Sequence, residues 1–163
     1  MEWAYISPRL LLPPGTRSSQ LASRRRRVDD DVDELNKIGT AEELEIASLR
    51  RDSTLNNPVR IWVVRHGDDL YVRSVNGRSA AWFRGTQIRH EGHIEAGGVD
   101  KDVTFVDADP DINDQIDAAY RTKYHRYAAS IINHIVSAGA RSTTMKLVPL
   151  QQALGSKTGG KQR

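Results

Sequence analysis

Residues 59–75 read VRIWVVRHGDDLYVRSV, and this stretch decides the fold. The runs 59–65 and 70–75 are rich in β-branched and aromatic residues, which favour strands. Between them, Gly67-Asp68-Asp69 is typical of a turn. The stretch therefore predicts a β-hairpin, and the short connection makes its two strands antiparallel.

Helical signals flank this hairpin on both sides. Before it, Thr40-Ala41-Glu42-Glu43 matches a capping box, and the apolar spacing that follows predicts a helix over 40–51. After it, Asn76-Gly77 marks a second turn, and residues 79–84 are predicted as a short helical turn. The hairpin is thus expected between one helix and one short helical turn.

The second half of the chain predicts two strands at about 88–96 and 102–107, a long helix over 111–137 and a last strand at 143–148. Apolar residues recur along the helix every three or four positions, at Ile112, Ile116, Tyr120, Tyr124, Tyr127, Ile131 and Ile135. Such a stripe packs against a sheet. Five strands joined mostly by short turns, with two covering helices, predict a small, partly closed antiparallel barrel of the α+β class.

Composition excludes several functional classes. The 163 residues include no Cys, so disulfide scaffolds, thiolate zinc sites and cysteine nucleophiles are excluded. No apolar run is long enough to span a membrane, so no membrane partner is expected. The net charge is +5 over residues 1–27, −5 over 28–156 and +3 over 157–163. Because phosphate attraction dominates nucleic-acid binding, an acidic domain makes nucleic acid an unlikely partner.

Three segments are predicted from this charge pattern. Residues 1–37 are expected to be a disordered extension, basic and then acidic, residues 38–150 the folded domain, and 151–163 a flexible basic tail. Four explanations stay open for residues 1–27. They fit an organelle presequence, a basic arm for nucleic acid, an inert tail, or a start codon assigned too early.

The richest candidate segment is residues 71–85, YVRSVNGRSAAWFRG. A glycine turn followed by a short helix exposes backbone N–H groups, and arginine side chains beside it favour phosphate or carboxylate binding. Trp82 could stack on a planar ring. The alternative is that the turn only joins two elements and Trp82 belongs to the core. Arg73 would then pair with an acid such as Glu91 or Asp107.

Other polar residues predict no catalytic constellation. His90 and His93 stand three apart, so in a strand they point to opposite faces and chelate a metal poorly. The bases between the tyrosines of 120–127 would reach a ligand phosphate only at the helix edge. No nucleophile elbow, P-loop or dinucleotide fingerprint occurs in the sequence, and no acid–base dyad is expected.

Four stretches together resemble DUF2255, a small prokaryotic family of unknown function: 61–64, 70–84, 118–124 and 140–149. The resemblance covers residues 38–150. That family is similar to flavin-binding split barrels, which include pyridoxamine-phosphate-oxidase-like proteins and deazaflavin-dependent nitroreductases. The resemblance implies a small antiparallel split β-barrel with an N-terminal helix and a long C-terminal helix.

The resemblance also implies a cofactor site. Its candidate cofactor contacts are Arg73, Ser74, Gly77, Arg78 and Ser79, with Trp82 and Arg84 at the pocket edge. The implied cofactor is FMN or a deazaflavin coenzyme, the implied assembly is a homodimer, and the expected location is cytoplasmic. Because a fold does not fix a function, the alternative is a non-enzymatic barrel that binds an anionic small molecule or a partner protein.

Overall fold

A computed structural model describes residues 31–150. The predictions made for residues 1–30 and 151–163 lie outside the described residues. Residues 31–40 are helical. The compact unit that contains the barrel begins at Leu35.

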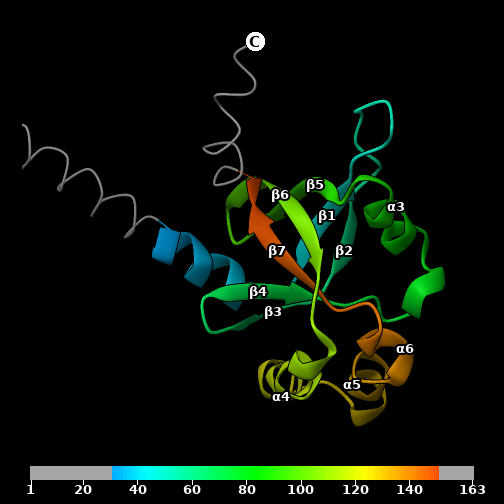
Figure 1. Cartoon of the computed structure of the whole chain (residues 1–163). Helices are drawn as coiled ribbons and strands as arrows, with labels where there is room; N and C mark the ends of the chain where they lie inside the picture. Colours follow the sequence, from blue (N-terminus) through cyan, green and yellow to red (C-terminus); the bar gives the residue numbers. More distant parts are fainter. Residues whose placement is uncertain (1–30, 151–163) are drawn as a thin grey trace, which may run out of the picture. The chain divides into compact units, whose positions relative to one another are not determined.

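Within the described residues, seven antiparallel strands form one sheet that wraps into a nearly closed barrel (Figure 1). The strands are β1 (Leu44–Ser48), β2 (Val59–Ile61), β3 (Val63–His66), β4 (Asp69–Val72), β5 (Glu91–Ala96), β6 (Val99–Asp107) and β7 (Met145–Pro149). Their order in the sheet is β2-β1-β5-β6-β7-β4-β3. The two ends of the sheet, β2 and β3, are therefore consecutive in the sequence, with only Trp62 between them.

The hairpin predicted from residues 59–75 is confirmed for β3 and β4, but residues 59–61, predicted as part of its first strand, form the separate strand β2 at the other end of the sheet. Val63 pairs with Val72, and His66 pairs with Asp69 at the turn. Gly67 has a φ of 63°, a conformation that glycine adopts without steric cost. Strand β4 then pairs with β7 on its other side, so the hairpin is joined to the rest of the sheet through the last strand.

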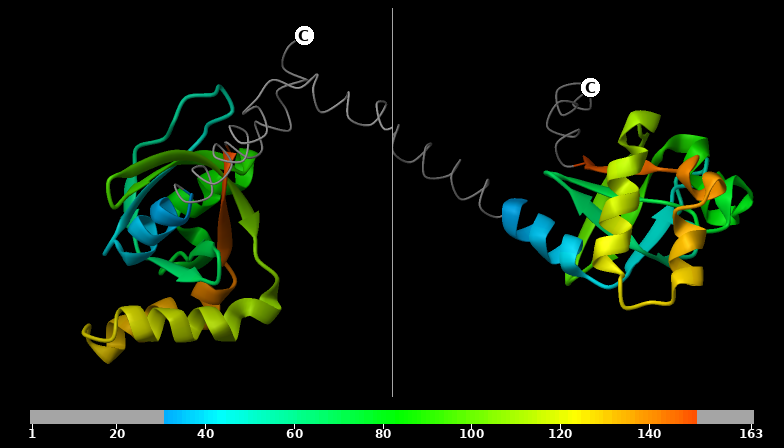
Figure 2. Two further views of the ribbon diagram at one scale, coloured as in Figure 1. Left: turned by 90° about the vertical axis from the view of Figure 1, so that its left-hand side faces the viewer. Right: turned by 90° about the horizontal axis from the view of Figure 1, so that it is seen from below.

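The helical elements lie outside the barrel (Figures 1 and 2). They are the 3-10 turn η1 (Gly77–Ser79), α3 (Ala81–Arg89), the 3-10 turn η2 (Pro110–Ile112), α4 (Asn113–Lys123), α5 (Ala129–Ile135) and α6 (Ala138–Arg141). In Figure 2, α4 and α5 run side by side across one side of the sheet, and the chain returns through α6 into β7.

Two apolar clusters hold these layers together. The first fills the barrel with residues such as Leu44, Val72 and Phe105. The second lies between the β3–β4 hairpin and helices α4 and α5, and it includes Val64 and Tyr120. The alternation of strand side chains explains this arrangement, because neighbouring residues Val63 and Val64 face different clusters. The α+β antiparallel barrel predicted from the sequence is confirmed.

The helix predicted over 40–51 is wrong. Residues 44–48 form β1 instead, and Thr40 belongs to the end of the helix over 31–40, where its hydroxyl donates to the carbonyl of Asn36 at 2.8 Å. Strand β1 is covered on both sides, so four of its five residues are buried. A short apolar run buried on both faces has no period that separates strand from helix.

The single helix predicted over 111–137 is also wrong. Helix α4 ends at Lys123, the backbone of Tyr124 leaves the helical region, and α5 begins only at Ala129. The apolar stripe changes phase at this break, since Ile132 is buried while Ile131 is 46% exposed. The short helical turn predicted at 79–84 is longer in the structure. Helix α3 runs to Arg89, so the next strand begins only at Glu91.

Candidate functional site

The predicted site residues fall into three places in the structure. Arg73 and Ser74 follow β4 and are buried. Gly77, Arg78 and Ser79 form η1. Trp82 and Arg84 lie on α3, and both line a groove. One sequence segment therefore supplies a buried network, a turn and a groove wall.

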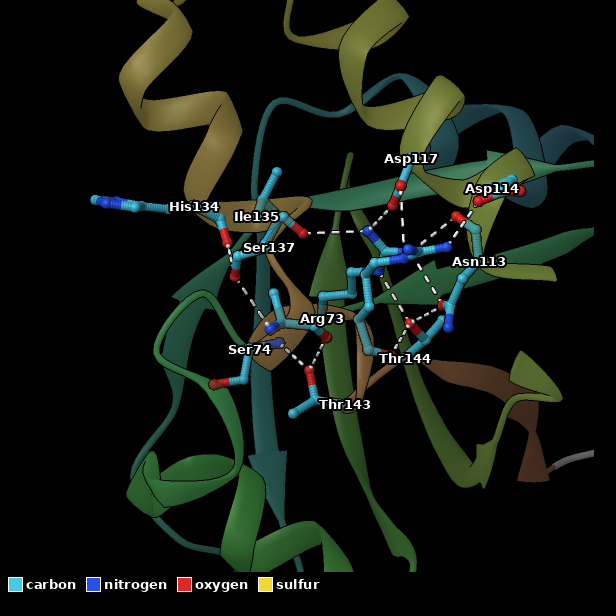
Figure 3. Close-up of polar contacts among 12 residues, drawn as sticks. Arg73, Ser74, Asn113, Asp114, Asp117, His134, Ile135, Ser137, Thr143 and Thr144 are labelled. Atoms are coloured by element: carbon cyan, nitrogen blue, oxygen red, sulfur yellow. Dashed lines mark hydrogen bonds and ion pairs between the residues drawn. The ribbon is translucent and has the colours of Figure 1, made fainter. Parts of the chain in front are cut away.

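Arg73 is the centre of the buried network (Figure 3). Its side chain is fully covered, and its three nitrogens donate to five acceptors. Nε reaches Thr144 Oγ1 at 2.9 Å, and Nη1 reaches Asp117 Oδ1 at 2.5 Å. The carbonyls of Ile135 and Asn113 and the Asn113 side chain accept the remaining bonds, each at 3.1 Å.

This network joins separate elements of the fold. Arg73 connects the end of β4 to α4 through Asp117 and to the end of α5 through the Ile135 carbonyl. Arg141 of α6 contacts Asp117 and donates to Asp114 at 2.7 Å. The acid partner of Arg73 is therefore Asp117, and the pairing with Glu91 or Asp107 is wrong. With every N–H engaged, a cofactor contact by Arg73 would require its side chain to leave these partners.

Ser74 contributes its backbone to the same region. Its N–H donates to Thr143 Oγ1 at 2.8 Å, and that hydroxyl donates to the carbonyl of Ala140 at 2.6 Å. The Ser74 hydroxyl is buried, points away from Thr143 and has no partner among the described residues (Figure 3). A buried hydroxyl without a partner costs free energy, and within the described residues Arg141 Nε is the other buried side-chain atom without a hydrogen bond.

The η1 turn packs against α6. Gly77 has a φ of 77°, and a Cβ there would lie 3.7 Å from the Gly139 carbonyl oxygen. Arg78 donates to the carbonyl of Ser142 at 2.9 Å, and its guanidinium lies 5.2 Å from the centre of the Phe83 ring. Ser79 donates to the carbonyl of Asn76 at 3.4 Å and is exposed. These contacts hold the η1 turn, which directly precedes α3.

The groove lies between α3 and the segment that joins β1 to β2. Its volume is about 720 Å³. Its lining is Ile46, Ser48, Arg50, Arg51, Asp52, Asn56, Asn57, Val59, Ala81, Trp82, Arg84, Gly85 and Ile88. The lining includes three arginines and one carboxylate, so the groove is electropositive. Arg50 is held in place by Asn56 at 2.9 Å and Thr54 at 3.1 Å.

The start of α3 adds uncommitted donors to the groove. No side chain caps its N-terminus, and its first turn carries no acid, so its first N–H groups keep free hydrogen-bonding capacity. Ala81 and Trp82 of this turn line the groove. Within residues 31–150, the side chains of Arg51 and Arg84 make no hydrogen bond or ion pair. Free N–H groups beside free guanidinium groups suit a phosphate or carboxylate.

The same groove offers little for acid–base catalysis. Among its described lining residues, Asp52 is the one carboxylate. Hydrogen bonds from the Thr54 side chain and backbone lower the Asp52 pKa, so this group stays ionised at neutral pH. The groove can bind and orient an anion, whereas chemistry would have to come from what is bound there.

The histidines do not form a metal site within the described residues, and no cluster of three ligating side chains is found there. His90 ends α3 with a φ of 59° and so does not share a strand with His93. His93 of β5 contacts Asp102 at 2.8 Å and also Asp100. Among residues 31–150, no helix is long and apolar enough to cross a membrane.

Arg50, Arg51 and Asn56 line the groove but were not among the predicted site residues. They were missed because Arg50 was placed at the end of a helix that does not exist. The turn signal Asn56-Asn57-Pro58 after an arginine pair was the available clue. The site therefore combines two predicted residues, Trp82 and Arg84, with a loop that sequence patterns did not connect to them.

Comparison with known families identifies one matching family model. A family model described as "Uncharacterized protein conserved in bacteria (DUF2255)" matches residues 34–147. This span is more than half of the chain, so the chain belongs to that family, and the resemblance predicted from the sequence is confirmed. No curated protein matches the chain.

Solved structures resemble the chain at low sequence identity, and the first one named here, whose TM-score exceeds 0.5, shows the split-barrel fold. A putative pyridoxamine 5'-phosphate oxidase from Listeria innocua is 12% identical, with a TM-score of 0.51, over 73% of this chain and 92% of that one. An F420 reductase is 12% identical, with a TM-score of 0.46, over 70% and 89%. HutZ, the heme storage protein of Vibrio cholerae, is 13% identical, with a TM-score of 0.46, over 76% and 88%.

Proposed function

We propose that this chain, a member of the DUF2255 family, binds a phosphate-bearing flavin or deazaflavin in the groove beside α3. One observation carries the proposal: the uncapped start of α3, the free Arg84 and Arg51 side chains and Trp82 converge on one groove. The fold likeness to a putative pyridoxamine 5'-phosphate oxidase supports a cofactor of this kind.

Different lining residues of the groove would contact different parts of the ligand. The first N–H groups of α3 and the guanidinium of Arg84 would donate hydrogen bonds to the phosphate oxygens, because charge-assisted bonds to an anion are the strong ones. Arg51 adds a second free cation on the opposite wall. Trp82 packs partly on the barrel core and presents an aromatic surface to the groove. A bound flavin or deazaflavin would supply hydride or electron transfer, and the chain would position it.

Binding titrations test the proposal directly. FMN and a deazaflavin coenzyme are titrated separately into the full-length chain, and the dissociation constant is followed by cofactor fluorescence. We expect R84A to weaken binding by about tenfold to a hundredfold, since a lost charge-assisted bond is worth about 1.5–3 kcal/mol. The double variant R51A/R84A should weaken it further. R121A, which removes an exposed arginine on α4 outside the groove, serves as the matched control.

Two results would contradict the proposal. One is the absence of saturable binding by both cofactors. The other is binding that R84A and R121A change equally, because the groove would then have no part in it.

The proposed homodimer and cytoplasmic location also stay predictions.

A second candidate function is a barrel that binds another anionic metabolite without redox chemistry. The observation that favours it is the donor set itself, which recognises an anion but includes nothing specific to a flavin ring. A thermal-shift screen of phosphorylated and carboxylated metabolites separates the two. A ligand that raises the melting temperature of wild type but not of R84A, while FMN and the deazaflavin have no effect, favours this candidate.

A further inference from the structure

A second hollow of about 450 Å³ lies between β3 and α4, and it shares no residue with the groove beside α3. Its lining is Gly39, Val64, Arg65, His66, Gln115, Ala118, Ala119, Thr122 and Lys123. Small side chains on α4 leave the space open. Lys123, the last residue of α4, contributes the amine.

The amine of Lys123 is held by a backbone carbonyl and an aromatic ring. Nζ donates to the Val63 carbonyl at 2.7 Å and lies 5.1 Å from the centre of the Tyr124 ring. Within the described residues, Lys123 forms no ion pair. Burial lowers the Lys123 pKa to about 8, although the nearby charge of Glu42 acts in the opposite direction.

The lining of the hollow includes basic side chains and no acid, although Asp68 lies 3.7 Å from Arg65 and Glu42 lies near Lys123. Glu42 is engaged by Arg126 and Tyr127, and the Tyr127 and Arg126 hydrogen bonds lower its pKa. Arg65 and His66 stand in the lining beside Lys123. Arg65 donates to the Gly67 carbonyl at 2.8 Å and also to Asn36, so its position is fixed.

We propose that Lys123 is a carbonyl-reactive amine that forms an imine with small anionic aldehydes in this hollow. The ammonium first releases a proton to water. The Nζ lone pair then forms a bond to the aldehyde carbon, and a proton moves from nitrogen to oxygen. Loss of that oxygen as one water molecule leaves a C=N bond, and water reverses the step. The Val63 carbonyl can keep one N–H of the neutral amine while the lone pair reacts.

Two features favour a small anionic aldehyde over a larger carbonyl compound. Ala118, Ala119 and Gly39 leave room for a few heavy atoms beside the amine. Arg65 in the lining favours a carboxylate at the rim. The simplest probe with both groups is glyoxylate.

Reductive trapping tests this proposal on the full-length chain. Glyoxylate is added near pH 7 with cyanoborohydride, which delivers hydride to the imine carbon and fixes a carboxymethyl group on nitrogen. Peptide mass spectrometry then gives the labelling rate of each lysine. We expect Lys123 to react about tenfold faster than Lys101 and Lys146, because more of its amine is neutral at this pH. The ratio should fall towards one near pH 10.

Variants separate a reactive site from a merely accessible lysine. K123R keeps a donor for the Val63 carbonyl and should remove only this label. A118F fills the hollow from an exposed position on α4 and should slow labelling at Lys123 but not at Lys101. E42Q removes the charge that raises the Lys123 pKa and should speed the reaction. Equal rates at the three lysines of the wild type, or a Lys123 rate that folded A118F leaves unchanged, overturn the proposal.

Discussion

Arg73 and Arg84 come from one short segment of the chain, yet the fold gives them opposite surroundings. Arg73 is fully covered and donates to five acceptors from two helices and the chain before β7. Arg84 is exposed in a groove, and its side chain makes no hydrogen bond or ion pair within the described residues. The first arginine holds elements together, whereas the second is free to bind something else.

The difference shows how a cation in a candidate site should be judged. A buried arginine without partners would be prohibitively costly, so its acceptors are part of the fold. An exposed arginine in a hollow needs no protein partner, and its donors remain for a ligand. Residue type alone therefore does not distinguish Arg73 from Arg84. The number of side-chain N–H groups that already have protein acceptors does distinguish them.

The largest expected effect is on the stability of the buried network. R73M keeps the apolar stem but removes the donors from which Asp117, Asn113 and the Ile135 carbonyl accept, which costs about 3–5 kcal/mol of unfolding free energy. R84M should change the unfolding free energy by less than about 0.5 kcal/mol, because the side chain is exposed and unpartnered. Urea denaturation of both variants measures the contrast. Similar losses in the two would abolish the distinction drawn between them.

An intermediate effect is expected where α3 forms the wall of the groove. A Cβ at Gly85 would lie 2.3 Å from Ser48 Oγ, which is buried and accepts from Asn56 at 2.8 Å. G85A should therefore cost about 1–3 kcal/mol in unfolding free energy. It should also weaken any ligand of the groove, since α3 must move away from β1.

A matched control for G85A lies on α6. A Cβ at Gly139 would meet nothing within 4 Å, so G139A should leave stability unchanged or raise it by up to about 1 kcal/mol. Thermal and urea denaturation compare the two alanines. Equal behaviour would mean that α3 does not pack on β1 as closely as described.

The smallest expected effect concerns the unpartnered Ser74 hydroxyl. Because that atom is buried without a partner, S74A should be neutral or stabilise the fold by up to about 1 kcal/mol. T143V should instead cost about 1–3 kcal/mol, since Thr143 accepts from the Ser74 N–H and donates to the Ala140 carbonyl. Unfolding curves of the two variants are compared with wild type. A clear loss in S74A would show that the hydroxyl has a partner after all.

The sequence predicted most accurately what local patterns control. The hairpin from Val63 to Val72 was predicted because its strands and its turn carry independent signals. Strand β1 was missed because it is buried on both sides and follows a sequence that resembles a helix start. The break after Lys123 was missed because no Gly or Pro stands between 124 and 128, and tertiary contacts of Tyr124 and Tyr127 take the place of such a signal.

The candidate site was predicted only in part. The segment with Trp82 and Arg84 was identified because arginines and an aromatic residue gather near a glycine turn. Arg50 and Arg51 could not be joined to it, since β1 and α3 come together only when the sheet curves. The burial of Arg73 was equally hidden, because its partner Asp117 lies on a helix distant in the sequence.

The position of β2 and β3 at the two ends of the sheet bears on association between molecules. Unpaired strand edges invite pairing with other chains and can seed aggregation. Here the edges are short, with three residues in β2 and four in β3. Each also carries an arginine, Arg60 or Arg65. Short, charged strand edges pair poorly with strands of other molecules. The two edge strands of this nearly closed barrel therefore resist growth into fibrils.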